Sequence, residues 1–299
     1  MSNQTDIQDV VTNKIIELIE GGELPPWRRP WDISQDGMMP YNVSTKANYN
    51  GINILILWYE ALDRGFSSNG WVTYKQAQAL GGQVKKGEKS VRCIFFKPIE
   101  IESEDGDEES KIIPCRRTFS VFNLEQVDGL DHLLPGKADG YSEVVEEATL
   151  CIEQLQRYCS NESIDVSQQG NVAAYSPSKD LIRLPTGFHS AGDHAATFAH
   201  ECIHSTGHRS RLDRFDKTTF NFSMEDESYA YEELIAELGA AFLCAQFNIQ
   251  GQHTQHACYL KHWLGKLKED KTFLFKASAA ANKAFQLILQ SANSKRVAA

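Results

Sequence analysis

Two histidines that flank a glutamate at helical spacing constrain this chain more than any other feature. The stretch ATFAHECIHSTGH contains His200, Glu201 and His204. Positions i and i+4 of a helix lie on one face about one turn apart, so both imidazoles can reach the same metal ion. Glu201 stands beside the first histidine, where it can act as general base towards a water that the metal activates. The pattern predicts a buried helix with a divalent-metal site of the metallopeptidase type, and zinc is the expected ion.

A third ligand is needed to complete such a site. A third histidine at the usual spacing would fall at position 210, which is Ser210. The later segment YEELIAELGAAFLC offers glutamates instead. Glu233 is the expected ligand, with Glu232 as the alternative. Glu237, one helical turn after Glu233, is expected to accept a hydrogen bond from the second nitrogen of a ligand histidine. A His/His/Glu set also accepts manganese or another divalent ion.

The composition is that of a soluble globular protein, with 41% apolar and 23% charged residues in 299. Seven scattered cysteines with no Cys-x-x-Cys pair favour a reducing compartment. The first residues, MSNQTDIQDVV, lack the pattern of a secretion signal. No apolar run approaches the roughly 18 residues that span a bilayer. We therefore expect a cytoplasmic protein without a membrane segment.

Periodicity and turn residues divide the chain into two domains of an α+β protein. In the first half we expect helices at residues 7–20, 50–64 and 72–82 and strands at residues 90–102 and 116–127. The acidic tract 102–109 would be the tip of the hairpin. Glycine, proline and aspartate indicate a linker at 131–141. The predicted domains are thus 1–130 and 142–299, the second mainly helical with a small sheet. Its segment SKDLIRLP is similar to an edge strand that could pair with an extended peptide.

Aromatic and basic residues alternate through the first half, although the net charge of the chain is −10. Aromatic rings can stack on bases and cations can neutralise phosphates, which is how single-stranded nucleic acid is held. The glycine-flanked Lys85-Lys86-Gly87 would form a basic turn. The candidate DNA-contacting residues are Trp27, Arg28, Arg29, Trp31, Lys46, Tyr49, Asn50, Trp71, Lys85, Lys86, Lys89 and Arg92.

Two sets of motifs, one in each half, resemble those of ArdC-type antirestriction proteins of conjugative plasmids. The first set reads PWRRPW, YNVSTKANYNGIN and GQVKKGEK, and the second reads AHECIHSTGHRSRLDR and YEELIAELGAAFL. The resemblance implies an N-terminal single-stranded-DNA-binding domain joined to a zincin-like metallopeptidase domain. It also implies metal ligands at His200, His204 and Glu233 and a general base at Glu201.

The function that this resemblance implies is protection of incoming plasmid DNA from host restriction enzymes. Single-stranded DNA is the expected partner, and a protein of the host restriction system is the expected substrate of a zinc-dependent peptidase site. Two alternatives stay open. The protein could be a DNA-binding shield whose metal only stabilises the fold, or a cytoplasmic metallopeptidase with no DNA role.

Overall fold

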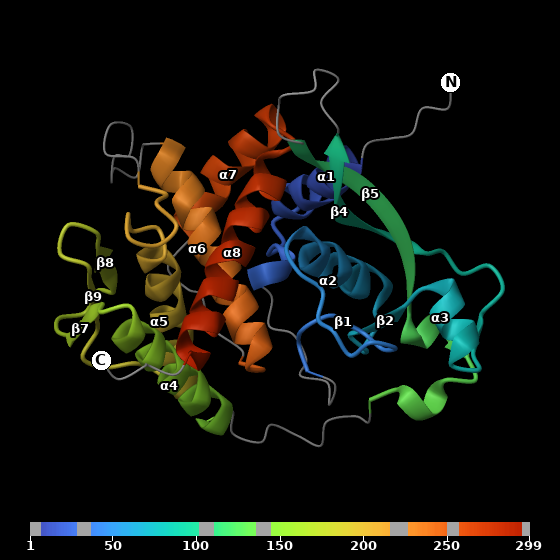
Figure 1. Cartoon of the computed structure of the whole chain (residues 1–299), viewed down its shortest axis with the longest axis horizontal. Coiled ribbons are helices and arrows are strands. Elements are labelled where there is room, and N and C mark those ends of the chain that lie inside the picture. The colour runs from blue at the N-terminus through green and yellow to red at the C-terminus, as the bar shows by residue number, and fades with distance from the viewer. Residues whose placement is uncertain are drawn as a thin grey trace. The chain divides into compact units, whose positions relative to one another are not determined.

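The computed structural model describes residues 7–28, 37–101, 111–135, 145–215, 227–249 and 257–294. The chain forms two compact units, which are Pro40–Pro135 and the combination of Met1–Met39 with Gly136–Ala299 (Figure 1). The boundary between the units at residues 135 and 136 falls within the range 131–141 that was predicted as the linker. The unit limits differ from the predicted domain 1–130 at the N-terminus, because the described residues 7–28 and 37–39 are grouped with the C-terminal unit.

The N-terminal segment has contacts that explain this difference. Helix α1 (Ile7–Glu20) spans the predicted residues and packs against α7 (Ala257–Glu269). The hydroxyl of Thr12 on α1 donates to the carbonyl of Lys271 at 2.9 Å. The 3-10 turn η1 (Pro26–Arg28) contacts α6 (Glu227–Gln246). The backbone N–H of Met38 donates to Oδ1 of Asn248 at 3.0 Å. These contacts attach the segment to the helical unit at several points.

The C-terminal unit is mainly helical with a small sheet, as predicted. Its further helices are α4 (Val145–Asn161), α5 (Ala191–Ser205) and α8 (Phe273–Asn293). Its strands are β7 (Asp165–Gln168), β8 (Ala174–Ser176) and β9 (Leu181–Leu184), in the order β7-β9-β8. Strand β9 pairs with β7 in parallel and with β8 in antiparallel orientation. The segment SKDLIRLP therefore contains the middle strand of the sheet, and the expectation of an edge strand was wrong.

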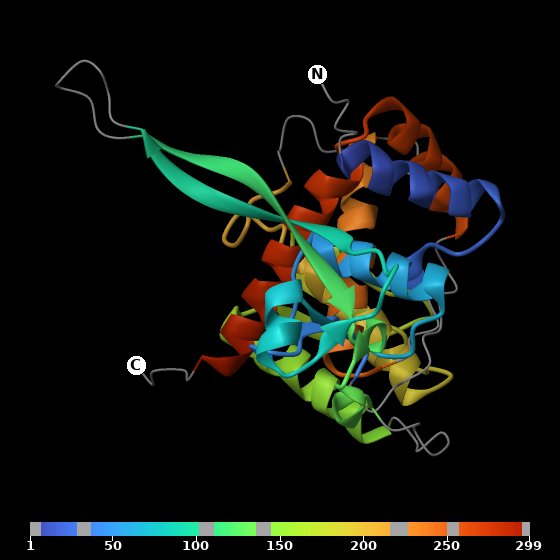
Figure 2. The same cartoon turned by 90° about the vertical axis from the view of Figure 1, so that its right-hand side faces the viewer.

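The unit Pro40–Pro135 is built on a four-stranded sheet in the order β1-β2-β5-β4. Its strands are β1 (Tyr41–Asn42), β2 (Gly70–Val72), β4 (Val91–Ile101) and β5 (Lys111–Asn123). The remaining elements are α2 (Ile52–Arg64), α3 (Tyr74–Ala79), β3 (Gln83–Val84), η2 (Leu124–Gln126), β6 (Val127–Asp128) and η3 (Asp131–Leu133). Strands β4 and β5 run as a long, twisted two-stranded ribbon (Figure 2). The predicted strands are thus present, while the acidic tract 102–109 lies outside the described residues.

Strand β4 is an edge strand, and the side chain of Asn53 on α2 covers part of its edge. The amide of Asn53 donates to the carbonyl of Ile94 at 2.7 Å, and its oxygen accepts from the N–H of Ile94 at 2.8 Å. The backbone of Ile94 therefore faces away from β5. Pro98, four residues later, shares this orientation and pairs with Pro114 of β5. Both prolines thus lie where the ladder requires no N–H donor.

Candidate metal centre

The metal centre is built by two buried helices that pack closely. Helix α5 is capped by Ser190, whose hydroxyl accepts from the N–H of Asp193, and it carries both histidines on one face. Helix α6 crosses it at Gly239, where an added Cβ would lie 2.6 Å from Cδ1 of Ile203. A larger residue would hold the helices apart, so the predicted close packing at this glycine is confirmed. The contact brings Glu233 over the histidine pair.

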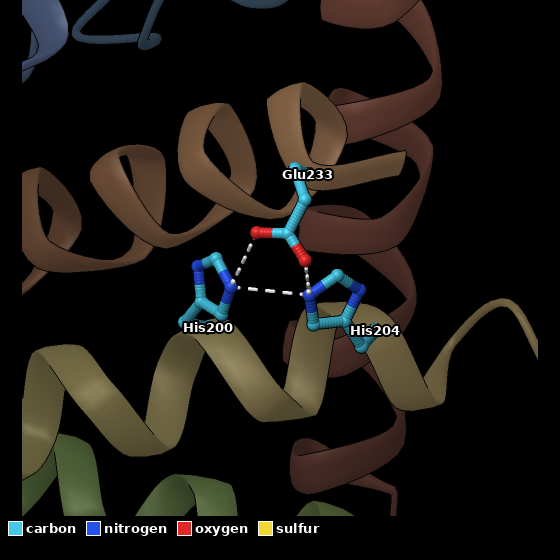
Figure 3. Close-up of side chains that lie close together, drawn as sticks. All are labelled: His200, His204 and Glu233. Atoms are coloured by element: carbon cyan, nitrogen blue, oxygen red, sulfur yellow. Dashed lines mark hydrogen bonds and ion pairs between the residues drawn. The ribbon is translucent and has the colours of Figure 1, made fainter. Parts of the chain in front are cut away.

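Figure 3 shows His200 and His204 pointing from α5 towards Glu233 on α6. The Nε2 atoms of the two histidines lie 3.1 Å apart. Glu233 places Oε2 at 3.5 Å from Nε2 of His200 and Oε1 at 3.4 Å from Nε2 of His204. One ligand atom from each residue lies within 4.8 Å of the others, and all three residues are buried. Sequence spacing thus located a convergent set of N, N and O donors.

The charge of the site fits a divalent cation. Burial lowers the pKa of His204, but the carboxylates of Glu233, Glu232 and Glu201 outweigh burial and raise this pKa to about 10. The cluster therefore holds an excess of negative charge that attracts a positive ion. Two imidazoles and a carboxylate form a donor set that suits zinc and other borderline divalent metals. The site residues fit such an ion on both geometry and charge.

Glu201 is buried at 6% exposure, next to the first histidine on α5. Its charge adds to the effect of Glu233 and Glu232, which raises the pKa of His204. A buried carboxylate one residue after a ligand histidine is a candidate general base. Its catalytic role stays a prediction.

A chain of polar contacts extends from His204 away from the ligand cluster. Nδ1 of His204 lies 3.3 Å from Oε1 of Glu232. Arg214 binds that carboxylate through two nitrogens, with Nε at 2.9 Å from Oε2 and Nη2 at 2.6 Å from Oε1. Arg214 also donates to the hydroxyl of Thr206 and to the carbonyl of Ile203 near the end of α5. Glu232 therefore faces the nitrogen of His204 that points away from Glu233, and the structure does not place it among the three donors.

Glu237 has different surroundings from those of Glu232. It is 1% exposed on α6. Burial raises the pKa of Cys244 to about 12, and the charge of Glu237 adds to that effect. The acceptor at Nδ1 of His204 is Glu232, and the role of Glu237 beside a ligand histidine stays a prediction.

A second arginine, which the sequence analysis missed, joins the end of α5 to the small sheet. Arg211 donates through Nε to the carbonyl of Ser205 at 2.7 Å and through Nη1 to Oδ2 of Asp180 at 3.0 Å. Asp180 also accepts from the hydroxyl of Tyr175 at 2.7 Å. Both arginines stand in the run RSRLDR after the second histidine. Two arginines spaced three apart directly after a buried helix were the signal that could have indicated them.

The predicted DNA-contacting residues divide into buried, exposed and undescribed groups. Trp27 and Trp71 are 4% and 0% exposed, so these indoles belong to the cores and neither presents a face for base stacking. Tyr49 is half-buried and stacks on Phe119. Arg29, Trp31 and the side chain of Arg28 lie outside the described residues. The exposed members are Lys46, Asn50, Lys85, Lys86, Lys89 and Arg92.

Two family models match the chain. The model for the N-terminal domain of the anti-restriction factor ArdC matches residues 5–122, and a model for a zincin-like metallopeptidase matches residues 153–280. Within the described residues, no helix has the length and apolar character needed to cross a membrane.

Several proteins are similar over most of the chain. Uncharacterized protein y4eC of Sinorhizobium fredii is 36% identical over 287 residues, which cover 93% of this chain and 89% of that protein. DNA primase TraC of Escherichia coli is 32% identical over 97% of this chain, but the match covers 20% of the primase. Crystal structures of the antirestriction ArdC protein from plasmid R388 match with a TM-score of 0.76. The metal-free form is 39% identical and the Mn(II)-bound form 37% identical, over 97% of this chain and 100% of theirs.

Proposed function

The chain belongs to the ArdC family of antirestriction proteins, and from that membership we propose that it binds single-stranded DNA and protects incoming plasmid DNA from host restriction. The proposal is supported by an exposed basic turn at Lys85, Lys86 and Lys89 in the region that matches the ArdC N-terminal model. The protein would act in the cytoplasm, where the incoming plasmid DNA arrives.

The metal centre acts as a peptidase site within this function, and its substrate is a protein of the host restriction system. The observation that carries this part is the buried convergence of His200, His204 and Glu233 beside Glu201. These three ligands would hold zinc, manganese or a similar divalent ion. Such an ion supplies Lewis-acid polarisation of a water and of a peptide carbonyl.

The residues of this chain then have separate tasks in peptide hydrolysis. Glu201 takes the proton from the attacking water and delivers it to the departing amine, as a positioned general base does. Glu232 accepts a hydrogen bond from Nδ1 of His204, which keeps Nε2 directed at Glu233. Arg214 neutralises and fixes Glu232, so that the site does not carry another uncompensated buried carboxylate.

A conjugation assay into restricting and non-restricting recipients tests this function. Three forms are compared: the wild type, Glu201→Gln, and a triple variant in which Lys85, Lys86 and Lys89 become alanine. We expect both variants to lose protection, with the metal still bound to Glu201→Gln. Full protection by Glu201→Gln would favour a DNA shield with a structural metal. Absence of salt-sensitive DNA binding in the wild type would favour a metallopeptidase without a DNA role.

A further inference from the structure

The base of the β4–β5 ribbon carries a buried apolar pair next to an exposed polar pair. Val91 pairs with Val121, and both side chains are buried at 3% and 0% exposure. The next pair, Arg92 with Ser120, points to the opposite face, and both residues are exposed. Since side chains alternate along a strand, Phe122 lies on the same face as Ser120. The Arg92–Ser120 pair is therefore exposed on this face, although Val72, which pairs with Phe122 on the same face, is buried.

Phe122 forms an aromatic pair with Tyr74 of helix α3. Phe122 is half-buried and contacts Tyr74 edge to face, with ring centroids 6.4 Å apart at 63°. Tyr74 is 44% exposed although it is a large ring. A capping box between Thr73 and Gln76 fixes the start of α3, where Tyr74 is the first residue. Gln83 donates to the Tyr74 hydroxyl at 3.1 Å. The exposed ring is therefore held in place.

A turn with three lysines, called the lysine turn below, begins two residues after Gln83, the residue that holds the Tyr74 hydroxyl. Gln83 begins β3, and the turn from β3 to β4 carries Lys85, Lys86 and Lys89, all exposed. Gly87 provides the turn with a φ of +89°, which other residues rarely adopt. The N–H of Lys85 donates to the carbonyl of Gln126 at 2.9 Å. The turn is therefore anchored at Lys85, whose ammonium also donates to the carbonyl of Glu125 at 2.8 Å.

The carboxylates near the turn already accept hydrogen bonds from the protein. Glu88 accepts from the Gln126 amide at 2.7 Å. Glu125 accepts from the backbone N–H groups of Ser67 and Ser68 at 2.6 and 2.8 Å. These bonds direct both carboxylates into the protein. The exposed charges near Tyr74 thus include the three lysines and Arg92, together with Asp128, which pairs with Gln83 across β3 and β6.

We propose that Tyr74, Phe122 and Arg92, with the lysine turn, form the surface on which the unpaired bases of single-stranded DNA stack. The inference rests on the proposed function and assigns its DNA-binding half to particular residues. Tyr74 presents a ring to a base, Phe122 supports that ring, and Arg92 with the lysines contacts the phosphates. A duplex hides its base faces, so the surface selects a single strand. This assignment replaces the buried Trp71 with Tyr74 as the stacking residue.

The ribbon supplies a matched control on its other face. Phe95 is also 44% exposed, and it pairs with the exposed Arg117. Phe95 is an odd number of residues from Arg92, so its side chain points to the opposite face. A phenylalanine and an arginine of similar exposure can thus be removed from the same ribbon without touching the proposed surface.

The test measures fluorescence anisotropy of a labelled thymidine oligonucleotide of about 20 nucleotides, longer than the usual site of a single-strand-binding module. The full chain is used across a salt series. We expect Tyr74→Ala to weaken binding about 5- to 100-fold, because one stacked base is lost. Tyr74→Phe keeps a ring and binds like the wild type.

The triple lysine variant lowers the log–log salt slope by roughly 2, since each lost phosphate contact contributes about 0.7. Phe95→Ala and Arg117→Ala change affinity less than about twofold, as expected outside a contact surface.

Each contrary outcome has its own meaning. No binding by the wild type at low salt refutes the proposed function itself. If Phe95→Ala weakens the binding of DNA and Tyr74→Ala does not, the proposed surface is refuted. Equal affinity for a duplex of the same length refutes base stacking. Tighter binding of a single-stranded RNA refutes DNA as the partner. Thermal melting of every variant confirms that the compared proteins are folded.

Discussion

At the level of single residues, Glu232 and Arg214 extend the metal centre beyond its three ligands. A carboxylate at the second nitrogen of a ligand histidine fixes the orientation and tautomer of the ring. Glu232 has this place at His204, and Arg214 holds Glu232 through two nitrogens. Sequence spacing had suggested Glu237 for this task, because it lies one turn after Glu233. At His204 the acceptor is Glu232, because α6 presents it towards Nδ1, and the role of Glu237 stays a prediction.

Replacing Glu232 by Gln or Arg214 by Ala is expected to weaken metal binding about 10- to 100-fold, the usual effect of losing such an outer contact. Isothermal titration with Zn²⁺ and Mn²⁺ measures the metal affinity of each variant. The matched control is Arg157→Ala, which breaks an exposed arginine–glutamate pair on α4. Unchanged affinity in both site variants would show that the chain from Arg214 to His204 does not position the ligand.

Asp180 provides a prediction about pH. Burial raises the pKa of its carboxyl, but Arg211 and the Tyr175 hydroxyl outweigh burial and lower this pKa below the ordinary value. A group with a lowered folded pKa adds stability above its unfolded pKa of about 3.9 and loses it as pH falls through the folded value. Asp180→Asn should therefore lower the free energy of unfolding by about 1–3 kcal/mol at neutral pH.

The difference between Asp180→Asn and the wild type should shrink as pH falls below about 4, because the wild-type carboxyl then also becomes neutral. Urea unfolding of both proteins at several pH values measures this difference in the free energy of unfolding. Asparagine tolerates the left-handed φ of 47° at this position, so the substitution tests charge and not backbone strain. A difference that is independent of pH would exclude the ion pair with Arg211 as its cause.

At the level of elements, the contact of α5 with α6 depends on Gly239. Alanine normally stabilises a helix relative to glycine by about 1 kcal/mol. At Gly239 the sign should reverse, because the new Cβ would lie 2.6 and 2.8 Å from Cδ1 and Cγ1 of Ile203. We expect Gly239→Ala to lower the stability by about 1–3 kcal/mol. It should also weaken metal binding, since Glu233 precedes Gly239 by less than two helical turns.

Gly265 on α7 is the control for this change, because nothing lies within 4 Å of a Cβ added there. Gly265→Ala should raise the melting temperature while Gly239→Ala lowers it, as measured by circular dichroism. The double variant Gly239→Ala with Ile203→Ala should recover part of the metal affinity. Equal effects of the two single alanine variants would show that α5 and α6 can separate without cost.

The elements with strong local signals were predictable from the sequence, and the pairing of elements was not. The range of α1 follows from its apolar spacing and from the glycines that end it. The His200–Glu201–His204 helix and Glu233 follow from ligand spacing. The position of β9 in the middle of its sheet depends on the distant pairing with β7, which leaves no local signal. The burial of Trp71 is likewise a tertiary effect, because a tryptophan between Gly70 and Val72 suits a core and a surface equally.

At the level of the whole molecule, charge is unevenly distributed. The chain has a net charge of −10. The described residues of the unit Pro40–Pro135 carry eleven lysines and arginines and seven aspartates and glutamates. Six further carboxylates lie in the acidic tract beyond the described ribbon. A local basic surface therefore exists on an acidic protein, and contacts with DNA phosphates need to be basic only where the strand lies.

The metal ligands and the proposed DNA surface lie in different compact units, which predicts that the two activities can be separated. His200→Ala removes one ligand from α5 but leaves the unit Pro40–Pro135 unchanged. We expect this variant to lose metal binding by at least about tenfold and to bind single-stranded DNA within about twofold of the wild type. The triple lysine variant should behave in the opposite way. Titration with Zn²⁺ and oligonucleotide anisotropy in a metal-free buffer measure the two properties on the same preparations. A loss of DNA affinity in folded His200→Ala would instead mean that the metal centre controls the DNA surface, and the units would then have to be treated as one coupled device.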